Sequence, residues 1–365
     1  MTKNTPSRKL IFWLIFFLFF TVVPFLLIEG AGRAYMHFKY GKSGKSYGLW
    51  KSDKELGAIF AENAYNSNAE TNDYGFRNAE AVINPKPEGA LRVIAYGGST
   101  TFCYNLFNNE AWPALLEQHL RQSHNPKDQV LNGGVITWSI GHLYRRAKRD
   151  LPKLKPDYVL LYTGINEHQN YSFAAEEGKN LSENVAKGEY ATVATNLDQA
   201  GWAKRNLVSM RFLDYVLYPF LEKKAAQNRD KIAEQMSGGT ENVPTSPDSI
   251  ILKNYQHVLR DFITLIREQG GKPVFIIEAH SKKKPVNYYL GSYSRVSASI
   301  AQEMGVPVLD GLDVVNAYNG DTAELFIASG AHFEKKGAEL FASFLFENTF
   351  KPIIQPNNAV SILSK

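Results

Sequence analysis

Five short apolar runs divide the chain between residues 90 and 310. They occupy residues 92–96, 129–132, 158–163, 273–278 and 306–309, and they are rich in β-branched side chains. Each run is too short for a helix and is followed by a turn or by small and polar residues. Continuous apolar runs of this kind are typical of strands that are buried on both faces of a parallel sheet.

Amphipathic helical patterns lie between these runs. The apolar positions of residues 112–120 recur at helical spacing, and a longer apolar stripe over residues 255–266 ends at Gly270 and Gly271, a helix stop. Alternating strands and helices imply right-handed crossovers. The sequence therefore predicts a three-layer α/β/α fold, in which a parallel sheet of about five strands is covered on both faces. In such a sheet the functional site lies beyond the carboxyl ends of the strands.

The N-terminus carries a different pattern, because residues 10–28 contain no charge and are almost wholly apolar. A helix needs roughly 20 such residues to cross a bilayer, so we expect one N-terminal transmembrane helix that anchors the protein. A cleaved signal peptide is the alternative, since small residues follow Glu29. The basic residues on the two sides are nearly balanced, so charge does not predict the orientation.

These patterns divide the chain into segments. We expect a membrane anchor at 1–29, a connector and edge segment at 30–90, the main domain at 91–350 and a C-terminal tail at 351–365. A helical and loop insertion at 171–250 interrupts the alternation; it contains an apolar helical pattern from Leu213 to Phe220 and a Gly/Pro/Ser-rich loop at 237–249. The insertion follows a strand end directly, so it either roofs a site or is a structural elaboration.

Composition excludes several functions. The net charge is only +5, and no basic stripe is interleaved with aromatic residues, which argues against nucleic acid as a partner. The single cysteine, Cys103, excludes an intramolecular disulfide and a cysteine-based zinc cluster. No His or Asp cluster has the spacing of metal ligands, so we expect neither a metal nor an organic cofactor.

Four segments carry residues suited to acyl transfer. Ser99 lies in GGST after the first apolar run, Gly134 in NGGV after the second, Asn166 in GINE after the third, and His332 in SGAHFEKKG near the C-terminus. Each segment alone has a plain structural explanation as a turn, a helix cap or a surface residue. Together they supply a nucleophile, a base and donors for an oxyanion, which is the equipment that acyl transfer needs.

The same segments resemble the conserved blocks of the SGNH/GDSL hydrolases, over roughly residues 72–350. The upstream NDYGFR at 72–77 is similar to a segment common in membrane-anchored bacterial members. The resemblance implies a flavodoxin-like SGNH hydrolase fold. It also implies that Ser99 is the nucleophile and His332 the general base. The oxyanion hole would comprise the backbone amides of Ser99 and Gly134 and the side chain of Asn166.

One position departs from the family pattern. Three residues before the histidine the family has aspartate, and here that residue is Ser329. An aspartate would hold the imidazole tautomer and stabilise its charged form. Three alternatives follow: a Ser–His dyad with Ser329 or a backbone carbonyl orienting the ring, a substitute acid at Glu278 or Asp321, or a non-catalytic domain.

The resemblance implies a serine esterase that acts through a Ser99 acyl-enzyme. Its expected substrate is an acylated surface glycan, from which it would remove or transfer O-acyl (acetyl) groups. A lipid ester hydrolase is the alternative substrate class, and a non-catalytic glycan-binding or scaffolding protein is the alternative from another class. With the N-terminal helix retained, we expect a single-pass membrane protein whose catalytic domain lies outside the cytoplasm, in the periplasm.

Overall fold

A five-stranded parallel sheet forms the centre of the computed structural model. The structure describes residues 8–40, 46–66, 68–167, 207–210, 213, 216–217, 219–220, 249–282, 290–327 and 329–355. The sheet has the order β6-β5-β7-β8-β9. Its strands are β5 (Arg92–Gly97), β6 (Gln129–Asn132), β7 (Tyr158–Tyr162), β8 (Lys272–Ile277) and β9 (Val308–Asp310). In chain order this is 2-1-3-4-5, the flavodoxin-like arrangement. The predicted parallel sheet is confirmed, and β9 begins two residues later than expected.

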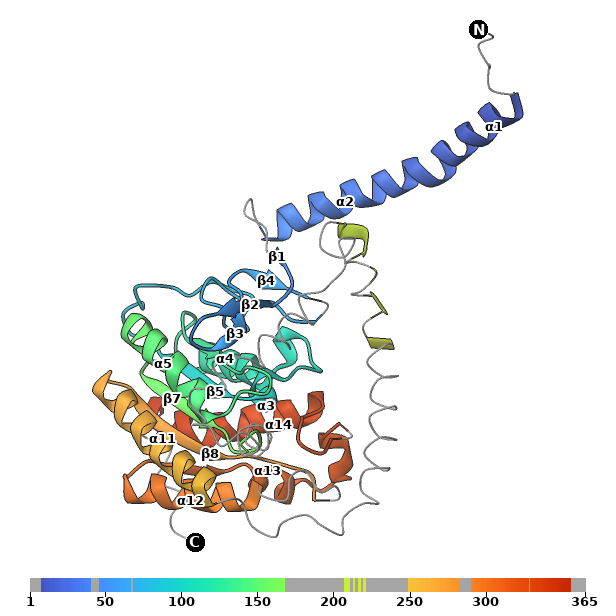
Figure 1. Ribbon diagram of the computed structural model, residues 1–365. Helices are drawn as coiled ribbons and strands as arrows, with labels where there is room; N and C mark the ends of the chain where they lie inside the picture. The colour runs from blue at the N-terminus through green and yellow to red at the C-terminus, as the bar shows by residue number, and fades with distance from the viewer. Residues whose placement is uncertain are drawn as a thin grey trace.

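Helices cover both faces of the sheet (Figure 1). One layer contains α5 (Ile140–Leu154), α11 (Ser249–Glu268) and α12 (Leu290–Glu303), and the other contains α4 (Trp112–Ser123), α13 (Leu312–Ala317) and α14 (Lys335–Leu345). Side chains of β5 alternate between the two cores: Ile94 and Tyr96 pack in the first, and Val93 and Ala95 in the second. This alternation follows from the period of two in a strand and confirms the predicted three-layer architecture.

The N-terminal residues form one helical rod that extends away from the domain (Figure 1). It comprises α1 (Arg8–Phe17), a π-helical turn η1 (Leu18–Val22) and α2 (Val23–Tyr40). Residues 8–35 form a helix that is long and apolar enough to cross a membrane, and a signal sequence can have the same length and composition. Near the end of the apolar run the Glu29 carboxylate accepts hydrogen bonds from the N–H groups of Val208 and Ser209, at 3.0 and 2.9 Å.

Residues 46–65 add two small sheets to the domain. Strands β1 (Ser46–Tyr47) and β4 (Ala64–Tyr65) pair in parallel, and β2 (Trp50–Asp53) and β3 (Gly57–Phe60) form an antiparallel pair. Trp50, Phe60 and Phe76 are buried in the same core as the first face of the main sheet. The segment expected as a connector and edge therefore contributes directly to the hydrophobic core.

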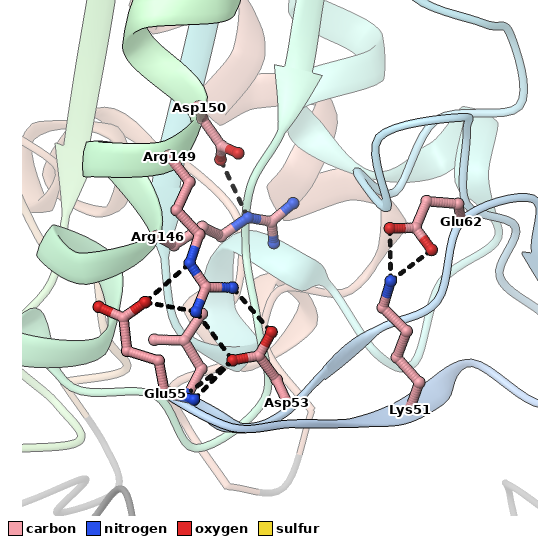
Figure 2. Close-up of polar contacts among 8 residues, drawn as sticks. Lys51, Asp53, Glu55, Glu62, Arg146, Arg149 and Asp150 are labelled. Carbon is pink, nitrogen blue, oxygen red and sulfur yellow. Dashed lines mark hydrogen bonds and ion pairs between the residues drawn. The ribbon is translucent and has the colours of Figure 1, made fainter.

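An ionic cluster holds the β2–β3 pair against α5 (Figure 2). The Arg149 guanidinium donates to both carboxylate oxygens of Asp53, at 2.7 and 2.9 Å, and to Glu55 at 2.9 Å. The hydrogen bonds from Arg149 hold the pKa of Asp53 well below its usual range. Arg146 pairs with Asp150 on the same helix, at 3.1 Å.

The insertion and the tail are described only in part. Within the insertion Leu213, Val216, Leu217 and Phe220 are helical and exposed, and the loop expected at 237–249 lies outside the described residues except for Ser249. After α14 the chain continues through the π-helical η5 (Phe346–Phe350) and α15 (Lys351–Ile354). The remainder of the expected tail lies outside the described residues, apart from Gln355.

Candidate active site

Ser99 opens a short helix at the carboxyl end of the central strand β5. Helix α3 (Ser99–Phe102) begins directly after Gly98, which is its N-cap. A Cβ at Gly97 would overlap the Thr101 hydroxyl and the Tyr162 carbonyl oxygen, and a Cβ at Gly98 would overlap the Asn166 amide. Only glycine fits at these two positions, because the backbone approaches Thr101, Tyr162 and Asn166 closely where Ser99 begins the helix at the sheet edge.

His332 lies in a loop between the 3₁₀ turn η4 (Thr322–Leu325) and α14. Its carbonyl accepts the Ile327 N–H at 2.9 Å, and the Gly330 carbonyl accepts the Ser281 N–H at 2.7 Å, which fastens the loop to the segment after β8. The ring Nε2 lies 2.8 Å from Ser99 Oγ. The first and last candidate residues, 233 positions apart in the chain, therefore lie within hydrogen-bond reach of each other.

The second ring nitrogen of His332 contacts Ser329. Nδ1 lies 2.9 Å from Ser329 Oγ, so a hydroxyl stands where the family pattern has a carboxylate. If Nε2 accepts the Ser99 proton, Nδ1 must carry the ring hydrogen and donate it to Ser329 Oγ. Asp321, one of the acids considered at this position, accepts the Ala323 N–H at 3.0 Å and caps η4.

The loop after α3 packs against the His332 ring. Tyr104 meets the imidazole edge to face, with ring centroids 4.6 Å apart. The Asn105 side-chain amide donates to the Phe333 carbonyl at 3.0 Å. The sequence analysis did not identify either residue, because nothing in the local pattern indicates a contact across more than two hundred positions.

Arg77, the last residue of NDYGFR, holds this loop from the inside. Its guanidinium is buried and donates to the carbonyls of Phe102, Cys103 (2.7 Å) and Leu106. Carbonyls at the end of a helix lack partners within the helix and attract a cation. Arg77 therefore caps the helix that carries Ser99. This contact gives a structural role to the NDYGFR motif, for which the sequence offered only a family resemblance.

Asn166 and Gly134 lie on either side of α3. Asn166 Nδ2 approaches Gly98 and donates one hydrogen to the Trp138 carbonyl, at 3.0 Å. A Cβ at Gly134 would overlap the Phe102 amide nitrogen, so this turn packs directly on the helix backbone. The Gly134 N–H donates to Asn132 Oδ1 at 3.0 Å, and Asn132 thereby emerges as a residue that orients the turn.

Two buried carboxyl groups lie behind these residues. Glu278 follows β8 and binds Thr100 and Ile165, while Glu167 follows Asn166 and accepts the Ile140 N–H at 2.8 Å. Burial raises the pKa of Glu278 to about 7 and the pKa of Glu167 to about 8. Among the described residues, no group of three or more His, Cys, Asp or Glu side chains is arranged to hold a metal ion.

Comparison with known proteins identifies the class. A parallel α/β/α sheet with a serine and a histidine in contact at its carboxyl edge is a hydrolase arrangement. The sequence model of the GDSL-like lipase/acylhydrolase family matches residues 95–340, and the chain belongs to this family. It is accordingly a serine hydrolase of ester substrates. A search of curated proteins found no match.

Several solved structures are similar. A lipase/acylhydrolase from Enterococcus faecalis is 14% identical with a TM-score of 0.42, covering 71% of this chain and 94% of that one. An acetylxylan esterase from Geobacillus stearothermophilus is 16% identical with a TM-score of 0.41, covering 73% and 97%. A psychrotrophic esterase from a Pseudoalteromonas species is 12% identical with a TM-score of 0.40, covering 70% and 94%.

Proposed function

We propose that the protein is a membrane-anchored serine esterase that acts through an acyl-enzyme on Ser99. The observation that carries the proposal is the continuous contact from Ser99 Oγ to His332 Nε2, at 2.8 Å, and from His332 Nδ1 to Ser329 Oγ, at 2.9 Å. A hydroxyl becomes an effective nucleophile when an adjacent base takes its proton and a third group orients that base.

Acylation follows from this geometry. Ser99 Oγ attacks the ester carbonyl carbon while its proton passes to His332 Nε2, and Ser329 Oγ accepts the hydrogen bond from Nδ1–H. The negative oxygen of the tetrahedral intermediate is stabilised by the Ser99 N–H and the second Nδ2 hydrogen of Asn166. The intermediate collapses when the C–O bond to the alcohol breaks and the imidazolium returns its proton to that oxygen.

Deacylation repeats these steps with a new nucleophile. Water attacks the acyl-enzyme carbonyl, His332 takes its proton, and Ser99 leaves with that proton as the acid is released. If a sugar hydroxyl replaces water, the same steps transfer the acyl group instead of hydrolysing it.

The Gly134 N–H can act as a third oxyanion donor only if it makes two hydrogen bonds at once. It already donates to Asn132 Oδ1, so it would have to share its hydrogen between Asn132 and the oxyanion. Asn166 has a hydrogen beyond the one that it gives to Trp138, so the proposal depends mainly on Asn166 and Ser99.

The substrate part of the proposal is an O-acyl, most simply O-acetyl, ester on a surface glycan. Its support is the resemblance of the NDYGFR segment and the N-terminal apolar helix to those of membrane-anchored bacterial members. Acetate release from an acetylated oligosaccharide, measured beside fatty-acid release from a lysophospholipid, tests it. Turnover of the lysophospholipid alone would favour a lipid substrate.

The decisive experiment on the nucleophile uses a fluorophosphonate probe. The wild-type chain should be labelled, and Ser99→Ala should not be. Ser343→Ala is the matched control, because this hydroxyl lies on α14 and contacts His119 and Glu339 instead of the site. Equal labelling of Ser99→Ala and wild type would refute the assignment.

Membrane anchoring by residues 10–28, with the catalytic domain outside the cytoplasm, is the last part of the proposal. Its support is the apolar N-terminal helix, whose residues 8–35 are long enough to span a bilayer. Protease added to intact spheroplasts should digest the domain, whereas full protection would reverse the orientation. Release of the protein from membranes by carbonate would indicate a cleaved signal peptide instead.

A further inference from the structure

A single buried carboxyl group connects three strand ends beneath the site. Glu278 follows β8 and is 2% exposed. Its Oε1 accepts the Thr100 hydroxyl at 2.9 Å, and its Oε2 accepts the Ile165 N–H at 2.7 Å. Both oxygens therefore have donors from other elements, one from α3 after β5 and one from the turn after β7.

The two donors are immediate neighbours of the proposed catalytic groups. Thr100 follows Ser99, and Ile165 precedes Asn166. One side chain thus binds the residue next to the nucleophile and the residue next to the oxyanion donor. A shift of either bond changes the separation between Ser99 and Asn166.

Two glycines lie next to this bridge. Gly164 has a φ of +146°, a backbone conformation that residues with a side chain rarely adopt, and it lies beside Glu278 Oε2. The Asn166 amide is in turn so close to Gly98 that no side chain fits between them. The ends of β5, β7 and β8 therefore meet at this carboxyl group.

We propose that Glu278 is a positioning residue, which sets the distance and orientation between Ser99 and the Asn166 amide by bridging Thr100 and Ile165. The proposal rests on the proposed function of Ser99 and Asn166. It gives Glu278 a different task from that of a substitute acid for His332, because the described contacts of its two oxygens are to Thr100 and Ile165.

A bridge of this kind does not require a negative charge. Burial raises the pKa of Glu278 to about 7, so near neutral pH a large share of the group is protonated. The protonated form still accepts the Ile165 N–H with one oxygen and can donate to the Thr100 hydroxyl with the other. Glutamine presents the same pair of groups, an acceptor and a donor, in the same shape.

The test compares Glu278→Gln with Glu278→Leu in the full chain, using an activated acetyl ester and the rate of fluorophosphonate labelling. Glu278→Gln should retain kcat within a few-fold of wild type. Glu278→Leu should lower kcat by about 10²-fold with KM changed far less, since small misplacements of reacting groups cost rates of this order. Thr100→Val removes one arm of the bridge, and it should lower kcat in wild type but add little to Glu278→Leu.

A matched control separates positioning from loss of stability. Glu117 is also largely buried, its pKa is raised by burial to about 7, and it accepts a strand N–H, that of Val130 at 2.7 Å. It lies on α4 and binds β6, away from the bridge described here. Glu117→Leu should lower the melting temperature without lowering kcat at an assay temperature below both transitions.

The outcomes decide the proposal. Wild-type kcat in Glu278→Leu would overturn it. So would an equal loss in Glu278→Gln and Glu278→Leu, which would show that the charge itself is needed. A kcat loss in Glu117→Leu equal to that in Glu278→Leu would overturn it as well. If Glu278→Leu does not fold, wild-type kcat in Thr100→Val overturns it and a selective kcat loss supports it. Activity retained by Ser99→Ala would instead refute the proposed function.

Discussion

Ser329 Oγ lies 2.9 Å from Nδ1 of His332, so in this member of the family a neutral hydroxyl contacts the ring nitrogen opposite the one that meets Ser99. A hydroxyl can accept the Nδ1 hydrogen and so select the tautomer in which Nε2 is free to take a proton. It cannot neutralise the imidazolium that would form, in the proposed mechanism, when Ser99 loses its proton. In a Ser-His-Asp triad one carboxylate both orients the imidazole and stabilises its positive charge. A hydroxyl at this position can do only the first.

Ser329→Asp should raise kcat on an activated ester. Loss of the triad aspartate in other enzymes lowers turnover by about 10⁴-fold, so even a partial recovery of that factor is measurable. Ser329→Ala should lower kcat, because Nδ1–H then loses the acceptor observed here. An unchanged or lower kcat in Ser329→Asp would indicate that another acid already supports His332. A kcat loss in Asp321→Asn, or a loss in Glu278→Gln larger than the few-fold change expected of a neutral bridge, would identify that acid.

Asn166→Ala should lower kcat by about 10²–10³-fold with little change in KM, since an oxyanion donor acts mainly in the transition state. Initial rates over a range of ester concentrations give the two constants. Asn348→Ala is the control, because that exposed side chain donates to the Phe344 carbonyl on α14. A rise in KM at constant kcat in Asn166→Ala would assign Asn166 to substrate binding instead.

Arg77→Lys should destabilise the domain despite the conserved charge. A lysine cannot reproduce the forked contacts to the Phe102, Cys103 and Leu106 carbonyls, and each buried bond to a charged group is worth about 1.5–3 kcal/mol. We expect a loss of at least about 2 kcal/mol in the free energy of unfolding, measured by urea titration.

The control for that measurement is Arg260→Lys. The exposed Arg260 guanidinium donates to both carboxylate oxygens of Glu303, at 2.8 and 2.7 Å, and exposed ion pairs of this kind contribute little to stability. Equal losses in the two variants would mean that the Arg77 contacts to the loop contribute no more to the free energy of unfolding than an exposed ion pair does.

The melting temperature should fall as the pH rises from 6.5 to 8.5. Burial raises the pKa of Glu167 to about 8, from an ordinary value of 4.5, so in this range the folded chain binds more protons than the unfolded chain. Stability that is present at low pH is therefore lost as the pH approaches 8. Burial lowers the pKa of His142 to about 3, so this histidine affects stability mainly below pH 6.5.

Glu167→Gln should reduce this pH dependence, because the amide cannot ionise. Part of the slope should remain in the lower half of the window, since burial also raises the pKa values of Glu278 and Glu117 to about 7. Glu324→Gln is the control: Glu324 is exposed, and its hydrogen bond with Tyr318 lowers its pKa, so its titration ends well below the window. Differential scanning fluorimetry at several pH values measures both. An identical slope in Glu167→Gln and wild type would contradict the assignment.

The sequence predicted the parts of the molecule that depend on local periodicity. Continuous apolar runs predicted the buried strands, and amphipathic patterns predicted the helices that cover the sheet. The order of short motifs indicated that Ser99 and His332 meet, and they lie 2.8 Å apart.

Contacts that depend on how loops pack were out of reach. No pattern in residues 103–106 indicates that Tyr104 meets His332, and the engagement of the Gly134 N–H by Asn132 depends on the local turn geometry. The sequence indicated Glu278 only as a possible substitute for the triad aspartate, near a strand end. Its bridge between Thr100 and Ile165 depends on the lateral order of β5, β7 and β8, which the one-dimensional pattern does not contain.

The contacts of Arg77 have a consequence for the order in which the site assembles during synthesis. Arg77 precedes its partner Cys103 by only 26 positions, so the ribosome delivers both ends of this contact almost together. His332 emerges 233 positions after Ser99. A chain that stops anywhere between these two positions carries the serine without its base. By the proposed mechanism, such a product is inert toward esters until residue 332 has been added.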